Sequence, residues 1–232
     1  MVFELLKELV FPRKCVFCGG ILSRHESGIC HGCRTALPEY GLQRYLRGLD
    51  GHCAVWYYQD AVRESLLRFK FHNRPDYARV YGPELAMRIQ RTLPKADLLT
   101  WVPVSKRRLK ERGYDQAELL AGETARELGI PAVKLLTKYR DNPAQSGLDT
   151  PEARLENVRD AYRIHPGRDL TGKRVILIDD ILTTGATAGE CARVLREAGA
   201  AQVFLAVVAS GSKHTEKLQH CAGEFPDKVS TY

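Results

Sequence analysis

Short apolar runs alternate along the chain with segments whose apolar positions recur at helical spacing. The run 175–178 (VILI) is apolar on both faces and rich in β-branched residues, which is typical of a central parallel strand. A helix is expected from about Thr187 to a stop at Gly199, and the apolar run 203–209 is expected to be the returning strand. This strand–helix–strand order predicts an α/β fold with a parallel sheet.

Further strands and helices are expected before this unit. Strands are predicted at 53–58 and 98–104, and a helix is predicted from Asp60, which we expect to be its N-cap. A second helix is expected after Asp115, because an acid three residues beyond this cap, Glu118, completes a capping box. The inward face of that helix and then its stop are marked by Ala117, Leu120, Ala121, Thr124, Ala125 and Leu128, followed by Gly129 and Pro131.

Composition divides the 232 residues into three parts. Residues 1–48 contain a short amphipathic helix and four cysteines, with too few apolar residues for a core of their own. Residues 49–210 contain the alternating strands and helices, and residues 211–232 form a tail. The polar stretch 140–157 is expected to be a lid or a binding loop, with a plain surface insertion as the alternative.

Overall composition excludes several classes of protein. Apolar residues make up 44% of the chain, which excludes a disordered tail protein and a collagen-like repeat. The longest apolar run has seven residues, and residues 1–10 lack a cleavage site, so we expect neither membrane insertion nor secretion but a cytoplasmic protein. Lys and Arg number 35 against 28 Asp and Glu, and the resulting charge of +7 allows an anionic partner.

Four of the seven cysteines form two C-x-x-C pairs near the start of the chain. Cytosolic thiols stay reduced, so we interpret the pairs as a metal site, with a disulfide or simple burial as the alternatives. Each pair can present two thiolates to one tetrahedral Zn²⁺, and four thiolates leave no open position on the ion. The sequence therefore predicts a structural zinc site formed by Cys15, Cys18, Cys30 and Cys33.

Two adjacent acids, Asp179 and Asp180, follow the strand at 175–178. The carboxyl ends of parallel strands are where ligands bind, and a turn of small residues there leads into the next helix. Exposed amides at that helix start can bind a phosphate, and the acids can bind ribose hydroxyls or a cation held by the ligand. The alternative is an ordinary turn in which Thr187 and Glu190 form a capping box.

A basic run occupies residues 106–112, with five cations in seven residues. Next to a phosphate site, these cations can bind pyrophosphate or a nucleic-acid backbone. The alternative is a solvated helix face. Aromatic residues nearby show no stacking periodicity, so composition supports single-strand binding only weakly.

The segment IDDILTTGAT (178–187) closely resembles the phosphoribosyl pyrophosphate loop of type I phosphoribosyltransferases. Three further blocks and the cysteine pairs are similar to the ComF family, also called ComFC or GntX. This resemblance implies a type I phosphoribosyltransferase-like parallel sheet flanked by helices, with a small N-terminal zinc ribbon held by four cysteines. The blocks are KFHNRPDY (70–77), VPVSKRRLKERGYDQAELLA (102–121) and NPAQSGLDTPEARLENV (142–158).

The resemblance also implies roles for individual residues. Asp179 and Asp180 would contact the ribose hydroxyls, and Arg154 would lie in a flexible catalytic loop at 145–157. The pyrophosphate, with Mg²⁺, would be held by Ser105, Lys106 and Arg107, with Arg112 adding positive charge. The 5′-phosphate would be wrapped by Thr183, Thr184, Gly185, Ala186 and Thr187.

Two functions follow from the resemblance. ComF relatives act in natural transformation, so the chain would bind phosphoribosyl pyrophosphate as ligand or signal and handle imported single-stranded DNA, with a competence helicase as partner. Alternatively, the chain is a working phosphoribosyltransferase that transfers ribose 5-phosphate to a base or an amine. The sequence leaves turnover and the acceptor open.

Overall fold

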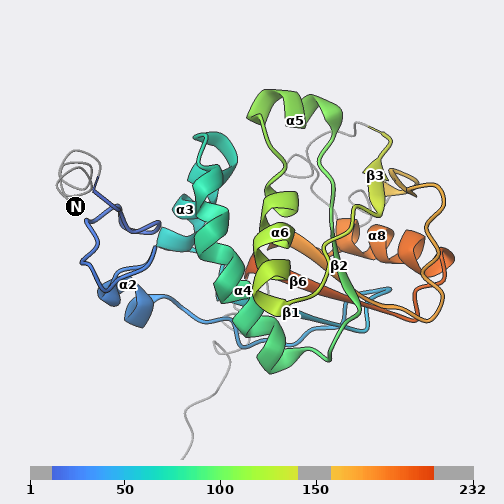
Figure 1. Cartoon of the computed structure of the whole chain (residues 1–232), viewed down its shortest axis with the longest axis horizontal. Coiled ribbons are helices and arrows are strands. Elements are labelled where there is room, and N and C mark those ends of the chain that lie inside the picture. The colour runs from blue at the N-terminus through green and yellow to red at the C-terminus, as the bar shows by residue number, and fades with distance from the viewer. Residues whose placement is uncertain (1–11, 141–157, 212–232) are drawn as a thin grey trace, which may run out of the picture.

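The computed structural model describes residues 12–140 and 158–211. Its centre is a four-stranded sheet in the order β1-β6-β5-β2, and all neighbouring strands are parallel (Figure 1). The expected α/β fold with a parallel sheet is confirmed. The strands are β1 (Gly51–Tyr57), β2 (Leu98–Trp101), β5 (Arg174–Leu182) and β6 (Gln202–Ser210).

Helices cover both faces of this sheet. Ile176 and Ile178 of β5 pack into a core shared with α3, α4 and α6, while Val175 and Leu177 pack into a second core shared with α8. This alternation is what a strand buried on both faces requires. The helices are α3 (Asp60–Phe71), α4 (Ala78–Thr92), α6 (Gln116–Leu128) and α8 (Ala186–Glu197).

Shorter elements lie around this frame. Helix α5 stands at one end of the molecule, at the top of Figure 1, and a two-stranded antiparallel sheet, β3-β4, lies near α8. The cysteine-containing segment with α2 lies beside α3 in the same view. These elements are α2 (His31–Ala36), the 3-10 helix η1 (Pro75–Tyr77), α5 (Lys106–Arg112), β3 (Leu136–Lys138) and β4 (Tyr162–Ile164).

Most expected helix boundaries agree with the structure, and one is wrong. Asp115 caps α6 by accepting hydrogen bonds from the amides of Ala117 and Glu118, and the helix ends at Gly129 in the left-handed region (φ +66°). Helix α3 is instead capped by Gln59, whose side chain makes no capping hydrogen bond, and Asp60 is the first helical residue. The acid still favours this helix start through its charge near the positive end of the helix dipole.

Strand β2 is shorter than the expected strand at 98–104. Its pairing with β5 ends at Trp101 opposite Ile178, and the amide of Val102 donates one last hydrogen bond to the Ile178 carbonyl. Pro103 then ends the pairing, because proline has no amide hydrogen to donate. Strand β5 continues alone on this side, so its last residues face an open space.

The cysteine-containing segment shares a core with the central sheet and the helices α3 and α4. The Phe17 ring contacts the Trp56 ring edge-on, with centroids 5.1 Å apart. Arg68 of α3 donates from Nη2 to the carbonyls of Val16 (2.9 Å) and Phe17 (2.7 Å). Apolar packing and these hydrogen bonds therefore hold the segment against α3 and β1.

Several expectations fall outside the described residues: the amphipathic helix in 1–10, the catalytic loop with Arg154, and the tail from 212 onward. None of the helices in the described ranges combines the length and the apolar character needed to cross a bilayer.

Candidate ligand-binding site

A cavity of 430 Å³ opens where β5 extends beyond β2. It lies at the carboxyl ends of the parallel strands, the usual ligand position in such sheets. Its walls come from the end of α3, the loop before α5, α5 itself, the start of α6, β3-β4 and the start of α8. Polar and charged residues among its lining are Tyr58, Lys70, Arg108, Arg112, Gln116, Lys138, Tyr162, Asp179, Asp180, Thr183 and Thr187.

The acid pair lies in this cavity, near the carboxyl end of β5. Asp180 is buried and forms an ion pair with Lys70, with Oδ2 and Nζ 2.9 Å apart. The Asp180 amide donates to Asp179 Oδ1 at 2.8 Å. Desolvation, and then the neighbouring Asp180 charge, raise the pKa of Asp179 well above its usual range. A cation, or hydroxyl donors of a ligand, would therefore stabilise the ionised form of this pair.

The turn after β5 leads into α8 with no side-chain cap. Gly185 is the N-cap, with φ +83°, a left-handed conformation that favours glycine. A Cβ atom on it would lie 2.8 Å from Leu46 Cδ2. Arg44 Nη2 donates to the Thr183 carbonyl at 2.8 Å, and this hydrogen bond helps to fix the turn. The alternative, a capping box of Thr187 and Glu190, does not begin this helix, because the N-cap is Gly185. No N-cap side chain therefore competes with an anion at the start of α8.

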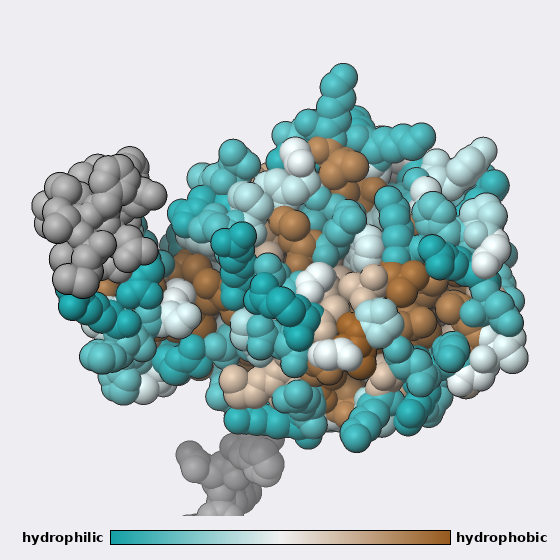
Figure 2. Space-filling view, viewed as in Figure 1, coloured by the Kyte–Doolittle hydropathy of each residue, from teal (hydrophilic) through white to brown (hydrophobic). Residues whose placement is uncertain are grey.

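Helix α5 divides the basic run between two faces. Arg108 and Arg112, four residues apart, line the cavity. Lys106, Arg107 and Lys110 are exposed, and Figure 2 shows that the surface at this end of the molecule is largely hydrophilic. One short helix therefore presents cations both to the cavity and to solvent.

The four predicted zinc ligands lie together. Their Sγ atoms are all within 4.8 Å of one another, and those of Cys18 and Cys30 are 3.7 Å apart. Zn–S bonds of about 2.3 Å in a tetrahedron require S–S distances of about 3.8 Å. Amide groups of Gly20, Cys30 and Cys33 point at the Sγ atoms of Cys18, Cys15 and Cys30, each at 3.4 Å, as expected around thiolates. The residues present therefore fit a zinc site.

Comparison with known proteins agrees with this geometry. A phosphoribosyl transferase domain model matches residues 115–229. Competence protein ComFC of Bacillus subtilis is 33% identical over 192 residues, covering 81% of this chain and 73% of that protein. DNA utilization protein YhgH of Salmonella typhi is 30% identical over 220 residues, covering 84% of this chain and 96% of that protein. The chain belongs to the ComF family.

Among solved structures, glutamine phosphoribosylpyrophosphate amidotransferase from B. subtilis matches with 27% identity and a TM-score of 0.41. The match covers 60% of this chain and 30% of that chain. For this ComF-family chain, the matched domain and the observed sheet together give a type I phosphoribosyltransferase-like fold with a four-cysteine cluster near its start.

Not every residue that the resemblance points to lines the cavity. Ser105 is buried and caps α5 by accepting a hydrogen bond from the Arg108 amide, and Lys106 and Arg107 lie outside the cavity lining. Thr184 does not line the cavity either, but its Oγ1 accepts from the Ala186 amide at 3.4 Å. The acid pair, Arg112, Thr183, Gly185, Ala186 and Thr187 do line the cavity.

Sequence reasoning missed several cavity residues. Lys70 belongs to the first ComF block but received no role, although a lysine in the last turn of a helix can reach beyond the helix end. Arg108 shares a helix face with Arg112, and this i, i+4 spacing was visible in the sequence. Lys138 and Tyr162 come from β3 and β4, whose place over the cavity no local pattern indicates.

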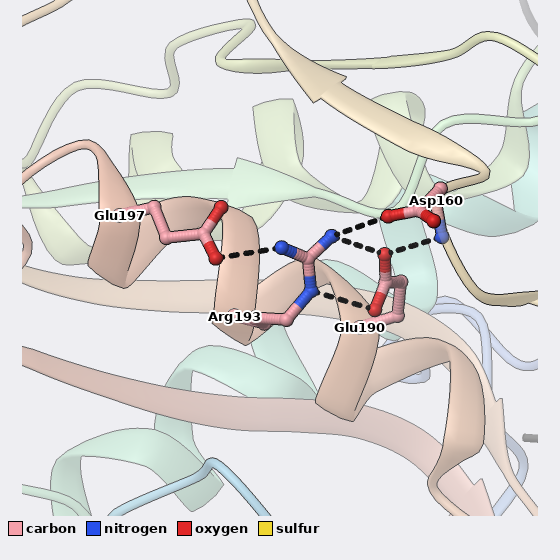
Figure 3. Close-up of polar contacts among 4 residues, drawn as sticks. All are labelled: Asp160, Glu190, Arg193 and Glu197. Atoms are coloured by element: carbon pink, nitrogen blue, oxygen red, sulfur yellow. Dashed lines mark hydrogen bonds and ion pairs between the residues drawn. The ribbon is translucent and has the colours of Figure 1, made fainter.

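An exposed network anchors the chain just after residues 141–157 (Figure 3). The Asp160 amide donates to Glu190 Oε1 at 2.8 Å, and Asp160 has φ +54°. Arg193 pairs with Glu190 at 2.7 Å and with Glu197 at 2.6 Å, and reaches Asp160 at 3.3 Å. The network joins the segment before β4 to α8, the helix whose start lines the cavity.

Proposed function

We propose that this ComF-family protein binds phosphoribosyl pyrophosphate with Mg²⁺ in the cavity and handles imported single-stranded DNA during natural transformation, in the cytoplasm. One observation supports the ligand assignment above all. The acid pair and the start of α8, which has no side-chain cap, line the same cavity, together with the cations Lys70, Arg108, Arg112 and Lys138.

Each part of the ligand has a matching part of the cavity. Asp179 and Asp180 accept hydrogen bonds from ribose hydroxyls, and the amides at the start of α8 receive the 5′-phosphate. Arg108 and Arg112 bind the pyrophosphate. Bound with the ligand, Mg²⁺ would neutralise part of the pyrophosphate charge. Ser105 acts by starting α5, which places both arginines at the cavity wall.

The DNA-handling role uses the other face of α5. Lys106, Arg107 and Lys110 are exposed and lie outside the cavity lining, and exposed cations bind nucleic-acid phosphates by releasing counterions. The names of the relatives, a competence protein and a DNA utilization protein, support this direction. The same role implies contact with a competence helicase, which a pull-down with the purified helicase tests.

A working phosphoribosyltransferase is the second candidate. In the described part of the chain, neither Arg108 nor Arg112 forms an ion pair with a carboxylate. Two such guanidinium groups can neutralise a departing pyrophosphate as the bond to C1 of the ribose breaks. Incubation with phosphoribosyl pyrophosphate, Mg²⁺ and a panel of bases and amines tests this function by the release of pyrophosphate.

Calorimetric titration tests the binding proposal. Phosphoribosyl pyrophosphate is titrated into the protein with Mg²⁺ and with EDTA, and ribose 5-phosphate provides the comparison without pyrophosphate. Saturable binding of phosphoribosyl pyrophosphate that weakens in EDTA supports the proposal. Absence of binding with Mg²⁺ contradicts it.

A further inference from the structure

Arg112 has unusual surroundings for an arginine inside a cavity. Its guanidinium lies over the Phe71 ring, with Cζ 4.9 Å from the ring centroid, and its Nη1 donates to Gln116 Oε1 at 2.9 Å. Within residues 12–140 and 158–211, no ion pair joins it to a carboxylate. Desolvation lowers its pKa. The guanidinium is thus held by two neutral groups, and described carboxylates such as Asp180 act on its charge without forming an ion pair with it.

Gln116 is the second half of this arrangement. It is only 1% exposed, it is the first residue of α6, and it lines the cavity. Its Oε1 accepts from Arg112, but its Nε2 is buried and makes no hydrogen bond to a described residue. The Gln116 amide lies near the Tyr114 hydroxyl and opposes the rise that desolvation causes in the pKa of Tyr114. Buried donors without a partner are rare in native proteins, so an amide kept in that state at a cavity wall indicates a role in the site rather than in stability.

The intervening residues fix the distance between the two side chains. Gly113 ends α5 in the left-handed region (φ +81°), and the Tyr114 hydroxyl donates to the Phe69 carbonyl at the end of α3. Asp115 caps α6 and also accepts from the Val104 amide at 3.0 Å. This turn is therefore tied to α3, to α6 and to the loop after β2, so the Arg112–Gln116 contact is built into the fold.

We propose that Gln116 is a positioning residue that orients Arg112 without neutralising it, and thereby gives the cavity its preference for a ligand with a pyrophosphate group over a sugar monophosphate. This inference rests on the proposed function. A carboxylate at this position would give the same hydrogen bond but would cancel the charge that attracts the pyrophosphate. The neutral amide keeps the full charge for the ligand.

Gln116→Glu tests the proposal because it preserves shape and adds a charge. Phosphoribosyl pyrophosphate with Mg²⁺ and ribose 5-phosphate are each titrated into the wild-type protein and the variant. We expect the affinity for phosphoribosyl pyrophosphate to fall by about 10- to 100-fold, the range for losing one hydrogen bond between Arg112 and the charged pyrophosphate. The affinity for ribose 5-phosphate should stay within about twofold. In an Arg112→Ala background, the uncharged change Gln116→Met should have no further effect, because the side chain that Gln116 orients is absent.

Two control results separate positioning from damage. Gln116→Met, which is similar in shape and uncharged, should retain more affinity for phosphoribosyl pyrophosphate than Gln116→Glu. Equal losses for both ligands, unchanged affinity for phosphoribosyl pyrophosphate in Gln116→Glu, or a greater loss in Gln116→Met would overturn the inference while leaving the binding site in place. A wild-type protein that binds neither ligand would overturn the proposed function itself.

Discussion

Lys70 Nζ lies 2.9 Å from Asp180 Oδ2, and this ion pair joins the last turn of α3 to the end of β5. The side chains are only 20% and 10% exposed. The ammonium compensates one of two adjacent carboxylates in a cavity that we propose also binds phosphate groups. Without it, the acid pair would repel the ligand it is proposed to bind.

Lys70→Met should therefore weaken ligand binding. Removing one positive charge from the cavity should lower the affinity for phosphoribosyl pyrophosphate about tenfold, which corresponds to ~1.4 kcal/mol. Lys70→Arg, which keeps the charge, should retain most of the affinity. Calorimetry with Mg²⁺ measures both variants, and equal affinity in Lys70→Met and the wild-type protein would show that the ion pair has no part in binding.

Gly185→Ala should reduce both stability and binding. The left-handed backbone at this position costs an alanine about 1–2 kcal/mol. The added Cβ, at the start of α8, would also clash with the side chain of Leu46. Chemical denaturation measures the free energy of unfolding, and calorimetry measures binding of phosphoribosyl pyrophosphate.

Gly129→Ala is the matched control for that variant. Gly129 also has a left-handed φ (+66°), but no atom lies within 4 Å of its added Cβ. It should lose a similar backbone contribution to stability and keep the ligand affinity. If both variants keep full affinity, the close packing at the start of α8 is not needed for binding.

The two faces of α5 should be separable by mutation. Lys106→Ala with Lys110→Ala removes exposed cations and should weaken single-stranded DNA binding while leaving affinity for phosphoribosyl pyrophosphate unchanged. Arg108→Ala, inside the cavity, should show the reverse. In filter binding, the slope of log affinity against log salt should fall by about 0.7 for each lost phosphate contact. A flat salt response of the wild-type protein would argue against DNA binding through these cations.

Zinc should be present at one ion per chain, and Cys30→Ser should release it. Loss of the metal should lower the melting temperature, because Val16 and Phe17 of the same segment belong to the main core. Cys53→Ala provides the control, since Cys53 is buried outside the cluster and its loss should lower stability without releasing zinc. Elemental analysis measures the zinc content per chain, and a metal-free, fully folded native sample would disprove the site.

Local patterns predicted the parts of this protein that depend on neighbours in sequence. The apolar run before Asp179, the cap at Asp115 and the two cysteine pairs each have a short-range signature, and each lies where the sequence indicated. The predicted cap of α3 at Asp60 was wrong by one residue, because an acid near a helix start suits the first turn as well as the N-cap.

Other features depend on tertiary structure. The pairing of Lys70 with Asp180 joins distant segments, and no local pattern assigns a partner to a lysine at a helix end. The basic run was equally consistent with pyrophosphate, nucleic acid and solvent. Only the placement of α5 over the cavity assigns Arg108 and Arg112 to one face and Lys106 to the other.

The proposed binding site is tested most directly by calorimetric titration of phosphoribosyl pyrophosphate, with Mg²⁺, into a variant combining Asp179→Asn and Asp180→Asn. Burial and like charge already disfavour the ionised form of Asp179, so Asp179→Asn should cost little stability. Asp180→Asn leaves Lys70 without its carboxylate and should lower the melting temperature, so circular dichroism is used to check that the double variant is folded. Binding should be abolished in this folded variant, because the groups proposed to hold the ribose hydroxyls and the Mg²⁺-bound ligand are neutralised. Affinity equal to that of the wild-type protein would show that the acid pair does not bind the ligand.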